Sequence, residues 1–524
     1  MLRSLLLLLP LLNFINPYKI LVYNPKYWHS NHNFFGCIAD ILAEEGHDVT
    51  SLISVLSPTH KDGSRLSKMI YVHPNDATAM HSESMRNDHA NLFETPLIDL
   101  LGAFKTRKDF GILWSSMCRT ILDEPGLMEK LKAEQFDVMI TENTDMCGMG
   151  ISHVISAKSV IMISSTVLYG RQYDEMGVPP SLSFNPSFYV TSLNPHYISD
   201  RFWNLISDIQ SRINYGGSRP YVDEVFQEKY GPEFPSLQEI SSRVAYGMAN
   251  SEPLIDFAKP TLHRIVEIPG LGSKEPHPLD EHWSKIMSLR DKAVLISFGS
   301  VVKSYDLSPA AKNSILKTIR GFPNVTFIWK YEDVEDDFAR EASKVDNLVM
   351  SPWMPQVDLL NHDNMVLFIS HSGMGSVQDT TKNGVPAMLI PLFDDQPRNA
   401  GMMEYNGLGK VFDKFDLGKF DKFFAMVKEL LENSSYRENS KRVAQMLARK
   451  PFSSRELLVK HVEFAAQFGP SPAMRPASHD MSFIKLYNLD ILVFVLAISL
   501  GIITFLSQLL ARICCCSVQK QKCD

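Results

Sequence analysis

The strongest constraint in this sequence is an alternation of short apolar runs with helical periodicity, which occurs twice along the chain. The first series opens with the apolar run 19–23, continues with a helical pattern up to Gly46 and returns to an apolar run at 48–53. A strand, a helix and a strand at this spacing predict a parallel sheet covered by helices. Further apolar runs at 137–141 and 159–163 extend this first predicted sheet.

A second series of apolar runs follows a Gly- and Pro-rich stretch at 268–278, which is typical of a linker between domains. Its predicted strands are 293–298, 325–329, 347–350, 365–370 and 386–390. The predicted fold is therefore α/β, with two doubly wound Rossmann-like domains that face a cleft. Ligands of such sheets bind outside the carboxyl ends of the strands. We predict an N-terminal domain at 18–270, a linker at 271–285 and a C-terminal domain at 286–470.

The two ends of the chain carry apolar segments of different length. Residues 1–17 hold a short leucine-rich run behind a positive charge, which is typical of a secretory signal peptide. Residues 490–512 are mostly apolar and have the length that a bilayer requires, so they predict a transmembrane helix in contact with membrane lipid. Basic residues in the tail 513–524 predict a cytosolic location, and Lys520 and Lys522 resemble a dilysine signal for return to the endoplasmic reticulum.

Charge and cysteine content exclude several kinds of site. The chain has 524 residues, a formal net charge of −7 and a pI near 6.2, so no nucleic-acid partner is predicted. Ahead of the C-terminal apolar segment lie the cysteines Cys37, Cys118 and Cys147. This odd and sparse set predicts no disulfide framework, and its spacing does not match a zinc site. The acidic run 332–337 is interpreted as a solvated loop, so no metal site is predicted.

The stretch 353–400 holds the residues best suited to bind a nucleotide. His371 follows the predicted strand 365–370, and Ser372 and Gly373 turn the chain into a helix. The N-terminus of a helix offers free N–H groups and a partial positive charge, which suit a diphosphate. A histidine at the same turn adds a further donor for that anion.

Three other side chains of this stretch suit the remaining parts of a nucleotide. Trp353 could stack on a base, and the amide of Gln356 could pair with its edge. Asp379 lies eight residues after His371 and could accept hydrogen bonds from a ribose. Each residue alone has an ordinary structural interpretation, such as a core tryptophan or a histidine at a strand end. The prediction of a nucleotide site therefore depends on their combination.

The motifs Trp353-Met-Pro-Gln356, His371-Ser-Gly373 and Asp395-Gln396, in this order, resemble the signature of the UDP-glycosyltransferase family. The closest resemblance is to its membrane-bound UDP-glucuronosyltransferase branch. It extends over the whole chain and is densest over 292–400. It implies a GT-B fold, inverting chemistry, no metal and no cofactor, with a UDP-sugar as the co-substrate.

The resemblance also assigns roles to individual residues of the second half. The implied donor-binding residues are Trp353 and Gln356 for uracil, Asp379 for ribose, Ser300, His371, Gly373 and Ser376 for the diphosphate, and Asp395 and Gln396 for the sugar. Two positions depart from the family pattern. Asp379 stands where the family usually has Glu, and Gly375 stands where it frequently has Asn.

The resemblance implies that the C-terminal domain 286–470 binds the UDP-sugar, and that the N-terminal domain 18–270 binds the acceptor and supplies the general base. In the family a histidine after the first strand removes the proton of the acceptor, and a carboxylate, here Glu142, orients that histidine. Counting back from Gly46 without a gap places the histidine position on Asn31, whereas a one-residue shift places it on His32. His29 is a third possibility, and a fourth is that none of these residues is a base. We take His32, paired with Glu142, as the predicted general base.

The sequence thus predicts a single-pass type I enzyme of the endoplasmic reticulum membrane, with lumenal catalytic domains. It would transfer glucuronate or another hexose to a small lipophilic acceptor. One alternative is a weakly active or inactive lumenal binding protein, or a partner subunit of the same fold. Another is a UDP-glucose-dependent lipid or sterol glucosyltransferase, since Lys330, Asp395 and Gln396 do not distinguish a sugar carboxylate from a hydroxymethyl. Homo- and hetero-oligomers both remain open.

Overall fold

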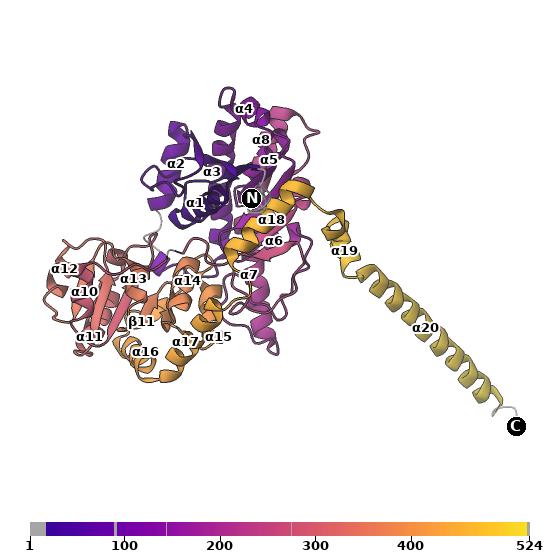
Figure 1. Cartoon of the computed structure of the whole chain (residues 1–524). Coiled ribbons are helices and arrows are strands. Elements are labelled where there is room, and N and C mark those ends of the chain that lie inside the picture. The colour runs from indigo at the N-terminus through magenta and orange to yellow at the C-terminus, as the bar shows by residue number, and fades with distance from the viewer. Residues whose placement is uncertain (1–16, 88–91, 143, 274, 521–524) are drawn as a thin grey trace, which may run out of the picture. The chain divides into compact units, whose positions relative to one another are not determined.

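The computed structural model describes residues 17–87, 92–142, 144–273 and 275–520 of the chain, which divides into two units at Met474. The unit that ends at Met474 contains two parallel sheets, which we call the first and second lobes together with the helices around them. The unit that starts at Arg475 contains the long C-terminal helix. Figure 1 shows the elements of each unit.

The sheet of the first lobe has, within the described residues, seven parallel strands in the order β3-β2-β1-β4-β5-β6-β7. Its strands are β1 (Lys19–Tyr23), β2 (Asp48–Ser54), β3 (Lys68–Val72), β4 (Val138–Glu142), β5 (Ser159–Ser164), β6 (Tyr246–Ala249) and β7 (Ile265–Glu267). The central strands β1 and β4 are mostly apolar and almost entirely buried, because helices cover both faces of a parallel sheet.

Helices of the first lobe fill the connections between these strands. They are α1 (His29–Glu44), α2 (Asp76–Asn87), α3 (Leu100–Asp123), α4 (Leu127–Ala133), α5 (Cys147–Val154), α6 (Gly170–Glu175), α7 (Ile198–Gly216), α8 (Arg219–Tyr230) and α9 (Leu237–Ser242). The predicted strands 19–23, 48–53, 137–141 and 159–163 correspond to β1, β2, β4 and β5, whereas β3, β6 and β7 were not predicted.

The sheet of the second lobe has six parallel strands among the described residues, in the order β10-β9-β8-β11-β12-β13. Its strands are β8 (Ala293–Ser297), β9 (Thr326–Lys330), β10 (Leu348–Ser351), β11 (Met365–Ser370), β12 (Ala387–Leu389) and β13 (Gly409–Val411). The first five match the predicted strands, so the prediction of two doubly wound sheets is confirmed.

Further helices connect and follow the strands of the second lobe, and the last of them returns to the first lobe. These helices are α10 (Glu281–Met287), α11 (Pro309–Arg320), α12 (Asp337–Ala342), α13 (Gln356–Leu360), α14 (Met374–Asn383), α15 (Gln396–Tyr405), α16 (Phe420–Glu432), α17 (Ser434–Ala448) and α18 (Ser454–Phe468). Helix α10 begins inside the predicted linker 271–285. Helix α18 falls within the predicted range 286–470 of the C-terminal domain, yet it packs in the core of the first lobe (Figure 1).

A disulfide bond joins Cys118 of α3 to Cys147 of α5, with a Cα–Cα distance of 5.6 Å. The prediction from the cysteine count therefore needs correction, because an odd number of cysteines still allows one pair. Helices α3 and α5 are neighbours in the packed first lobe, which brings two cysteines 29 residues apart into bonding range. Cys37 is a free thiol.

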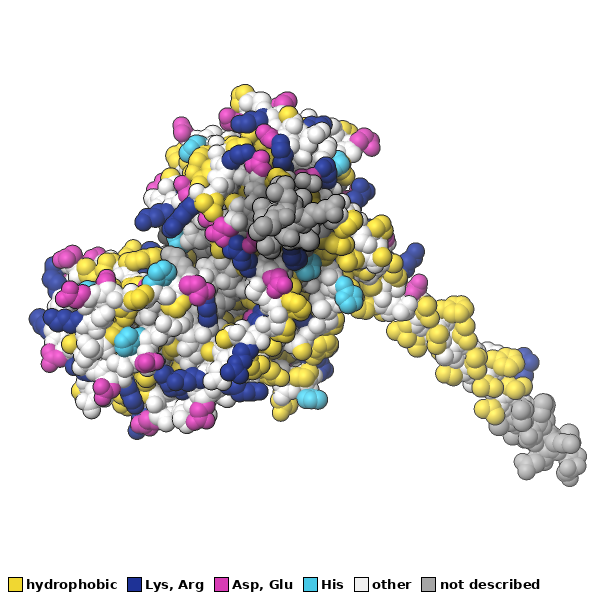
Figure 2. All heavy atoms as spheres, viewed as in Figure 1, with side chains coloured by type: hydrophobic (Ala, Val, Ile, Leu, Met, Phe, Trp, Pro, Cys, Tyr) yellow, Lys and Arg dark blue, Asp and Glu magenta, His cyan; other side chains and the backbone are white. Residues whose placement is uncertain are grey.

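The second unit contains a helix long and apolar enough to cross a membrane. Helix α20 spans Leu489–Lys520, and its segment Leu489–Arg512 has a mean hydropathy of 2.6 over its most apolar window. Hydrophobic side chains cover most of the surface of the segment Leu489–Arg512 (Figure 2). Of the predicted signal peptide 1–17 the structure describes only Pro17, and the end of the predicted tail, 521–524, also lies outside the described residues.

Candidate active site

The turn between β11 and α14 has the geometry expected of an anion site. The apolar strand β11 ends at Ser370, and His371 follows at its carboxyl end. Ser372 has a φ of 69°, and Gly373 caps α14 without a side-chain hydrogen bond to the helix. The first N–H groups of a helix have no partner within it, so this turn presents donors toward the carboxyl ends of the strands.

The imidazole of His371 is wedged between two glycines. A Cβ atom at Gly299 would lie 2.5 Å from His371 Nε2, and one at Gly373 would lie 2.6 Å from the same atom. Gly299 also has a φ of +87°, which L side chains rarely adopt. The chain therefore requires glycine on both sides of the ring. Ser300, which follows Gly299 after β8, is exposed next to this turn.

Burial keeps His371 uncharged at neutral pH. Loss of solvent, together with the nearby Lys330, lowers the pKa of His371 to about 4. Its Nδ1 atom is buried and has no hydrogen-bond partner among the described residues. A neutral imidazole has one N–H donor, so it can hydrogen-bond an anion without adding charge.

The residues predicted to hold uracil and ribose lie together beside this turn. Trp353, in the loop after β10, is 66% exposed, and Lys330 Nζ lies 5.6 Å from the centre of its ring. Gln356 Nε2 donates to Asp379 Oδ2 at 2.9 Å, and Ser273 Oγ donates to Asp379 Oδ1 at 3.1 Å. The side chains predicted to contact base and ribose thus bond to each other in the ligand-free structure.

Ser376 extends the same group. It is buried in the first turns of α14, and Gln356 Nε2 lies 3.5 Å from its hydroxyl. The structure therefore brings the predicted diphosphate residues His371, Gly373 and Ser376 to one helix start, adjacent to the predicted base and ribose residues.

The predicted sugar-binding pair, Asp395 and Gln396, lies at the start of α15. Gln396 Oε1 accepts the backbone N–H groups of Leu392, at 2.8 Å, and Phe393, at 3.2 Å, so its carbonyl oxygen closes the loop that leads to the helix. Asp395 accepts a hydrogen bond from Asn399 at 2.7 Å. Burial raises the pKa of Asp395 to about 6.

Asp394 was not singled out from the sequence, although the structure gives it an unusual environment. It has a φ of 58°, and its buried Oδ1 has no hydrogen-bond partner among the described residues. Burial, followed by the nearby Asp395 and Glu142, raises the pKa of Asp394 well above its ordinary value. Since Glu142 belongs to the first lobe, these carboxyl groups come close enough across the two lobes to influence each other.

The prediction that His32 pairs with Glu142 is wrong in geometry. His32 is fully buried; its Nδ1 lies 2.9 Å from Asn24 Oδ1, and its Nε2 accepts the backbone N–H of Gly63 at 3.1 Å. Both ring nitrogens are therefore used to hold the loops that follow β1 and β2. His32 is a structural residue of the first lobe, and it has no free nitrogen to take a proton from an acceptor.

Asn31 occupies the position next to Glu142. Its side chain hydrogen-bonds the carboxyl group of Glu142 and donates to Ser165 Oγ at 3.0 Å. Asn31 is the residue that the count back from Gly46 without a gap placed at the position of the family's histidine. His29 lies instead beside His60, with a ring-centre distance of 5.4 Å.

Glu142 is a buried acid at the carboxyl end of β4. It accepts a hydrogen bond from Thr144 Oγ1 at 3.1 Å. Burial, followed by the charge of Asp145, raises the pKa of Glu142 to about 8. Asp145, which accepts from Tyr23 OH at 2.7 Å, has its pKa raised by burial to about 7. Strongly shifted carboxyl groups in a cleft are typical of functional sites.

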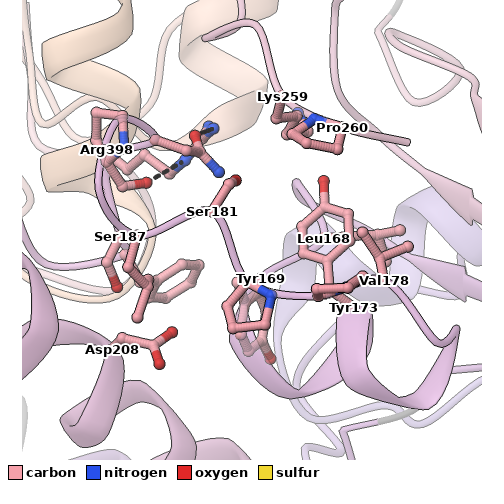
Figure 3. Close-up of a pocket in the computed structure, with 17 residues that line it drawn as sticks. Leu168, Tyr169, Tyr173, Val178, Ser181, Ser187, Asp208, Lys259, Pro260 and Arg398 are labelled. Atoms are coloured by element: carbon pink, nitrogen blue, oxygen red, sulfur yellow. Dashed lines mark hydrogen bonds between the residues drawn. The ribbon is translucent and has the colours of Figure 1, made fainter. Parts of the chain in front are cut away.

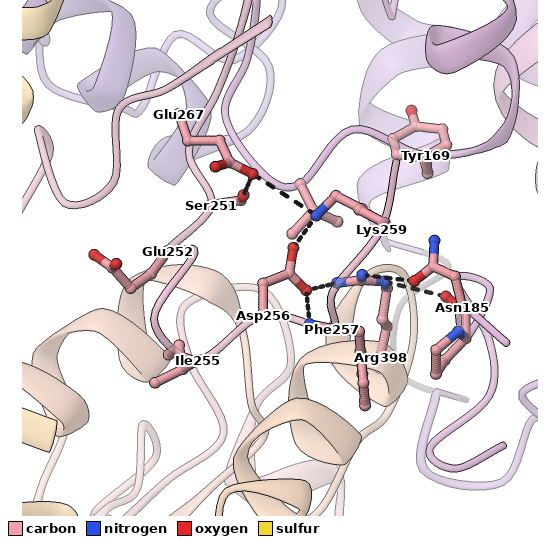
Figure 4. Close-up of polar contacts among 12 residues, drawn as sticks. Tyr169, Asn185, Ser251, Glu252, Ile255, Asp256, Phe257, Lys259, Glu267 and Arg398 are labelled. Carbon is pink, nitrogen blue, oxygen red and sulfur yellow. Dashed lines mark hydrogen bonds and ion pairs between the residues drawn. The ribbon is translucent and has the colours of Figure 1, made fainter. Parts of the chain in front are cut away.

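A buried ion-pair network, which was not predicted from the sequence, holds α15 against the first lobe. Arg398 Nη1 bonds Asp256 Oδ1 at 2.6 Å, and Lys259 bonds the same carboxylate (Figure 4). Arg398 Nε also donates to the carbonyl of Pro186 at 3.2 Å. Because Arg398 lies just after Gln396 on α15, this network fixes the helix that carries the predicted sugar-binding pair.

A pocket opens beside this network, between α6, the loop 178–188 and the segment around Lys259. It encloses about 490 Å³ of space that is not filled by protein, open solvent included. Figure 3 shows Tyr173, Lys259 and Arg398 around it, with Tyr169 at its lower side. Burial raises the pKa of Tyr169 above its ordinary range, and the charges of Asp394 and Glu142 raise this pKa further. Tyr169 therefore lies between this pocket and the carboxyl groups of the site.

Among the residues that the structure describes, no group of three or more His, Cys, Asp or Glu side chains could hold a metal ion. The predicted independence from metals and cofactors stays a prediction.

Comparison with known proteins gives the family. The family model for "UDP-glucoronosyl and UDP-glucosyl transferase" matches residues 19–523. A Caenorhabditis briggsae relative named as a UDP-glucuronosyltransferase is 29% identical over 504 residues, which are 94% of this chain and 92% of that protein. UDP-glucuronosyltransferase 1A7 of Mus musculus is 26% identical over 436 residues, which are 82% of this chain and 77% of that protein.

Solved structures agree on the fold. The calicheamicin glycosyltransferase CalG4 superposes with a TM-score of 0.57 at 14% identity, covering 87% of this chain and 100% of its own. Os79 from O. sativa superposes with a TM-score of 0.58 at 16% identity, covering 86% and 99%. The predicted GT-B fold is thereby confirmed. The chain belongs to the UDP-glycosyltransferase family, with UDP-glucuronosyltransferases among its relatives, and it is a UDP-glycosyltransferase.

Proposed function

We propose that this enzyme transfers glucuronate, or another hexose, from a UDP-sugar to a small lipophilic acceptor with inversion at the sugar carbon. The observation that carries the proposal is the turn at His371, where a neutral imidazole and the start of α14 converge beside the Trp353, Gln356 and Asp379 group. This arrangement offers a diphosphate, a base and a ribose their usual partners within one lobe.

When the donor binds, its groups would replace contacts that the protein side chains make with each other in the ligand-free structure. UDP would stack its base on the exposed Trp353, and its ribose would replace the contact between Gln356 and Asp379. The diphosphate would accept hydrogen bonds from the first N–H groups of α14 and from His371. Asp395 would then face the sugar hydroxyls, held in place by Asn399.

We assign the proton-accepting role to Glu142. The acceptor atom attacks C1 of the sugar, the bond between C1 and the phosphate oxygen breaks, and UDP leaves with the bonding electrons. The proton of the acceptor passes to the carboxylate of Glu142. A base with a pKa of about 8 matches proton transfer near neutral pH. Asn31 would orient the carboxylate, as its hydrogen bond indicates.

The absence of a histidine at position 31 limits the acceptors. At pH 7 most Glu142 side chains are protonated, so only a small fraction of the molecules has a free base. This favours acceptors that lose their proton easily and acceptors that lose it only after they have attacked the sugar. Amines and acidic phenols meet this condition better than aliphatic alcohols. We also propose that residues 1–17 direct the chain into the endoplasmic reticulum and that the lobes lie in the lumen, anchored by Leu489–Arg512.

The test is an activity screen on microsomes that contain the full chain. UDP-glucuronate and UDP-glucose are each offered with an arylamine, a phenol and an aliphatic alcohol of similar size. We expect transfer to the amine and the phenol, loss of transfer in Glu142→Gln, and normal transfer in Glu129→Gln, which changes an exposed residue of α4. Equal transfer by Glu142→Gln and the unchanged chain would refute the role of Glu142.

Asn31 also favours a second candidate, a binding protein or partner subunit of the same fold with little activity of its own. Under that alternative the purified chain binds UDP, as measured by calorimetry, but shows no turnover with any donor or acceptor. UDP binding should then still depend on His371 and Trp353.

A further inference from the structure

Helix α7 of the first lobe buries its polar side and exposes its apolar side. Its buried polar residues are Asn204, Ser207, Asp208, Gln210 and Ser211. Its exposed large apolar residues are Ile198, Phe202, Trp203, Leu205 and Ile209. A helix on the surface of a water-soluble domain normally has the opposite arrangement.

Hydrogen bonds on the buried side fix this orientation. Asn204 Nδ2 donates to the carbonyl oxygens of Leu182, at 2.7 Å, and Asn185, at 3.0 Å. Gln210 Nε2 donates to the carbonyl oxygen of Leu97 at 3.0 Å. Rotating the helix would leave these backbone groups without partners, at a cost of about 1–3 kcal/mol for each buried group. The apolar side of α7 therefore faces outward, because the polar side is needed inside to make these hydrogen bonds.

The start of α3 extends the apolar surface and adds positive charge. Helices α3 and α7 pack together, and Leu101 and Phe104 are exposed in the first turns of α3. Lys105 and Lys108 are exposed at helical spacing from Leu101, so they share its side of the helix. Hydrophobic side chains lie at the surface where α7 is found in the view of Figure 1 (Figure 2). We call the exposed side chains of α7, with Leu101 and Phe104, the α7 face.

We propose that the α7 face is a membrane-contacting surface that inserts its aromatic and aliphatic side chains into a bilayer containing anionic lipids. Two observations favour a bilayer over a protein partner. Residues 475–488 alone separate the two-lobed unit from the span at Leu489, so that unit cannot move farther than about 50 Å from the bilayer even if this segment is fully extended. Trp, Phe and Leu beside lysines are also the composition of helices that lie in a membrane interface.

The contact has a consequence for acceptors, which rests on the proposed function. Leu182 and Asn185, the carbonyl partners of Asn204, both line the pocket of Figure 3, and Asp208 of α7 lines it as well. A bilayer in contact with α7 would therefore lie one helix away from this pocket. Lipophilic acceptors dissolved in the membrane could reach the enzyme without crossing water.

Fluorescence quenching tests the membrane contact directly, without any measurement of activity. The full chain is reconstituted into vesicles of phosphatidylcholine and phosphatidylserine, with or without lipids brominated near the headgroup end of the acyl chains. The emission of Trp203 is the difference in fluorescence between the unchanged chain and the Trp203→Phe variant. We expect the brominated lipids to quench most of this emission. The control is Trp353, an exposed residue of the second lobe. Its emission, obtained in the same way from Trp353→Phe, should not be quenched. An unquenched Trp203 overturns the proposal, whatever the enzyme's activity.

A pair of charged substitutions tests the consequence for acceptors. Phe202 and Leu205 are exposed, so the double variant Phe202→Asp, Leu205→Asp should fold normally. We expect it to raise the KM for a vesicle-dissolved acceptor several-fold, with the KM for the UDP-sugar unchanged. The control is Leu289→Asp, an exposed apolar residue of the second lobe. If the double variant instead dissociates an oligomer in detergent while Trp203 stays unquenched, the face binds a second copy and the membrane assignment is wrong.

Discussion

Replacing Glu142 by Gln should stabilise the protein in a pH-dependent manner while it removes activity. Burial, followed by the charge of Asp145, raises the pKa of Glu142 from 4.5 to about 8. The folded protein therefore holds this proton more tightly than the unfolded chain does. For an acid shifted in this direction, stability is highest below the unfolded pKa and falls as the pH rises toward the folded pKa. Gln keeps the shape of the protonated side chain and cannot ionise.

The size of the effect follows from the two pKa values. Between pH 5 and pH 7 the group is ionised in the unfolded chain and mostly protonated in the folded one. At 1.36 kcal/mol for each pH unit, the free energy of unfolding contributed by Glu142 falls by about 3 kcal/mol over this interval. Above pH 8 the carboxyl group ionises in both states, and the difference stops growing.

Urea unfolding of the full chain in detergent, followed by tryptophan fluorescence at pH 5, 6, 7 and 8, measures this effect. We expect the stability of Glu142→Gln relative to the unchanged chain to increase by about 3 kcal/mol from pH 5 to pH 7. Glu129→Gln, at an exposed carboxylate, should show no such trend. A stability difference that is constant across this pH range would refute the assignment of Glu142 as a buried, protonated acid, and with it the proposed match between its pKa and its role.

Three further predictions address other parts of the site. Asn31→His should place an imidazole beside Glu142 and raise kcat for phenols by about 10²-fold, measured with saturating donor; an unchanged rate would show that the proton leaves elsewhere. Arg398→Ala should cost about 3–5 kcal/mol of unfolding free energy, because it leaves the Asp256 carboxylate buried beside a single remaining cation, and the additional change Asp256→Ala should recover part of the loss in urea unfolding. Cys118→Ala should cost about 3–4 kcal/mol, since the disulfide closes a loop of 29 residues; unchanged unfolding under reducing and oxidising conditions would contradict it.

Strands with strong apolar runs could be located from sequence, whereas edge strands could not. β1 and β11 are buried on both faces, so their composition alone marks them. β3 lies at the sheet edge and is half exposed, and its sequence alternates weakly. β13 has only three residues. Short and exposed strands form because a neighbouring strand supplies hydrogen bonds, and this tertiary contribution leaves little trace in the local sequence.

The candidate site shows the same division. The strand-to-helix turn at His371 is a local feature, and its residues are adjacent in sequence. The misplaced base was a problem of register: His32 and Asn31 are neighbours on α1, so one position of helical rotation decides which of them meets Glu142. The disulfide and the Arg398 network join segments far apart in the chain, and only the packed lobes reveal them.

Helix α18 restricts how this enzyme can be recombined with its relatives. Leu458, Val459 and Val462 are built into the hydrophobic interior of the first lobe although they come after every strand of the second. A chimera joined between the lobes would therefore exchange part of the acceptor half along with the donor half. Fusion points that keep α18 with its own N-terminal half should give correctly folded hybrids. A single junction near residue 275 would instead pair α18 with a first lobe from another protein and mismatch a buried interface.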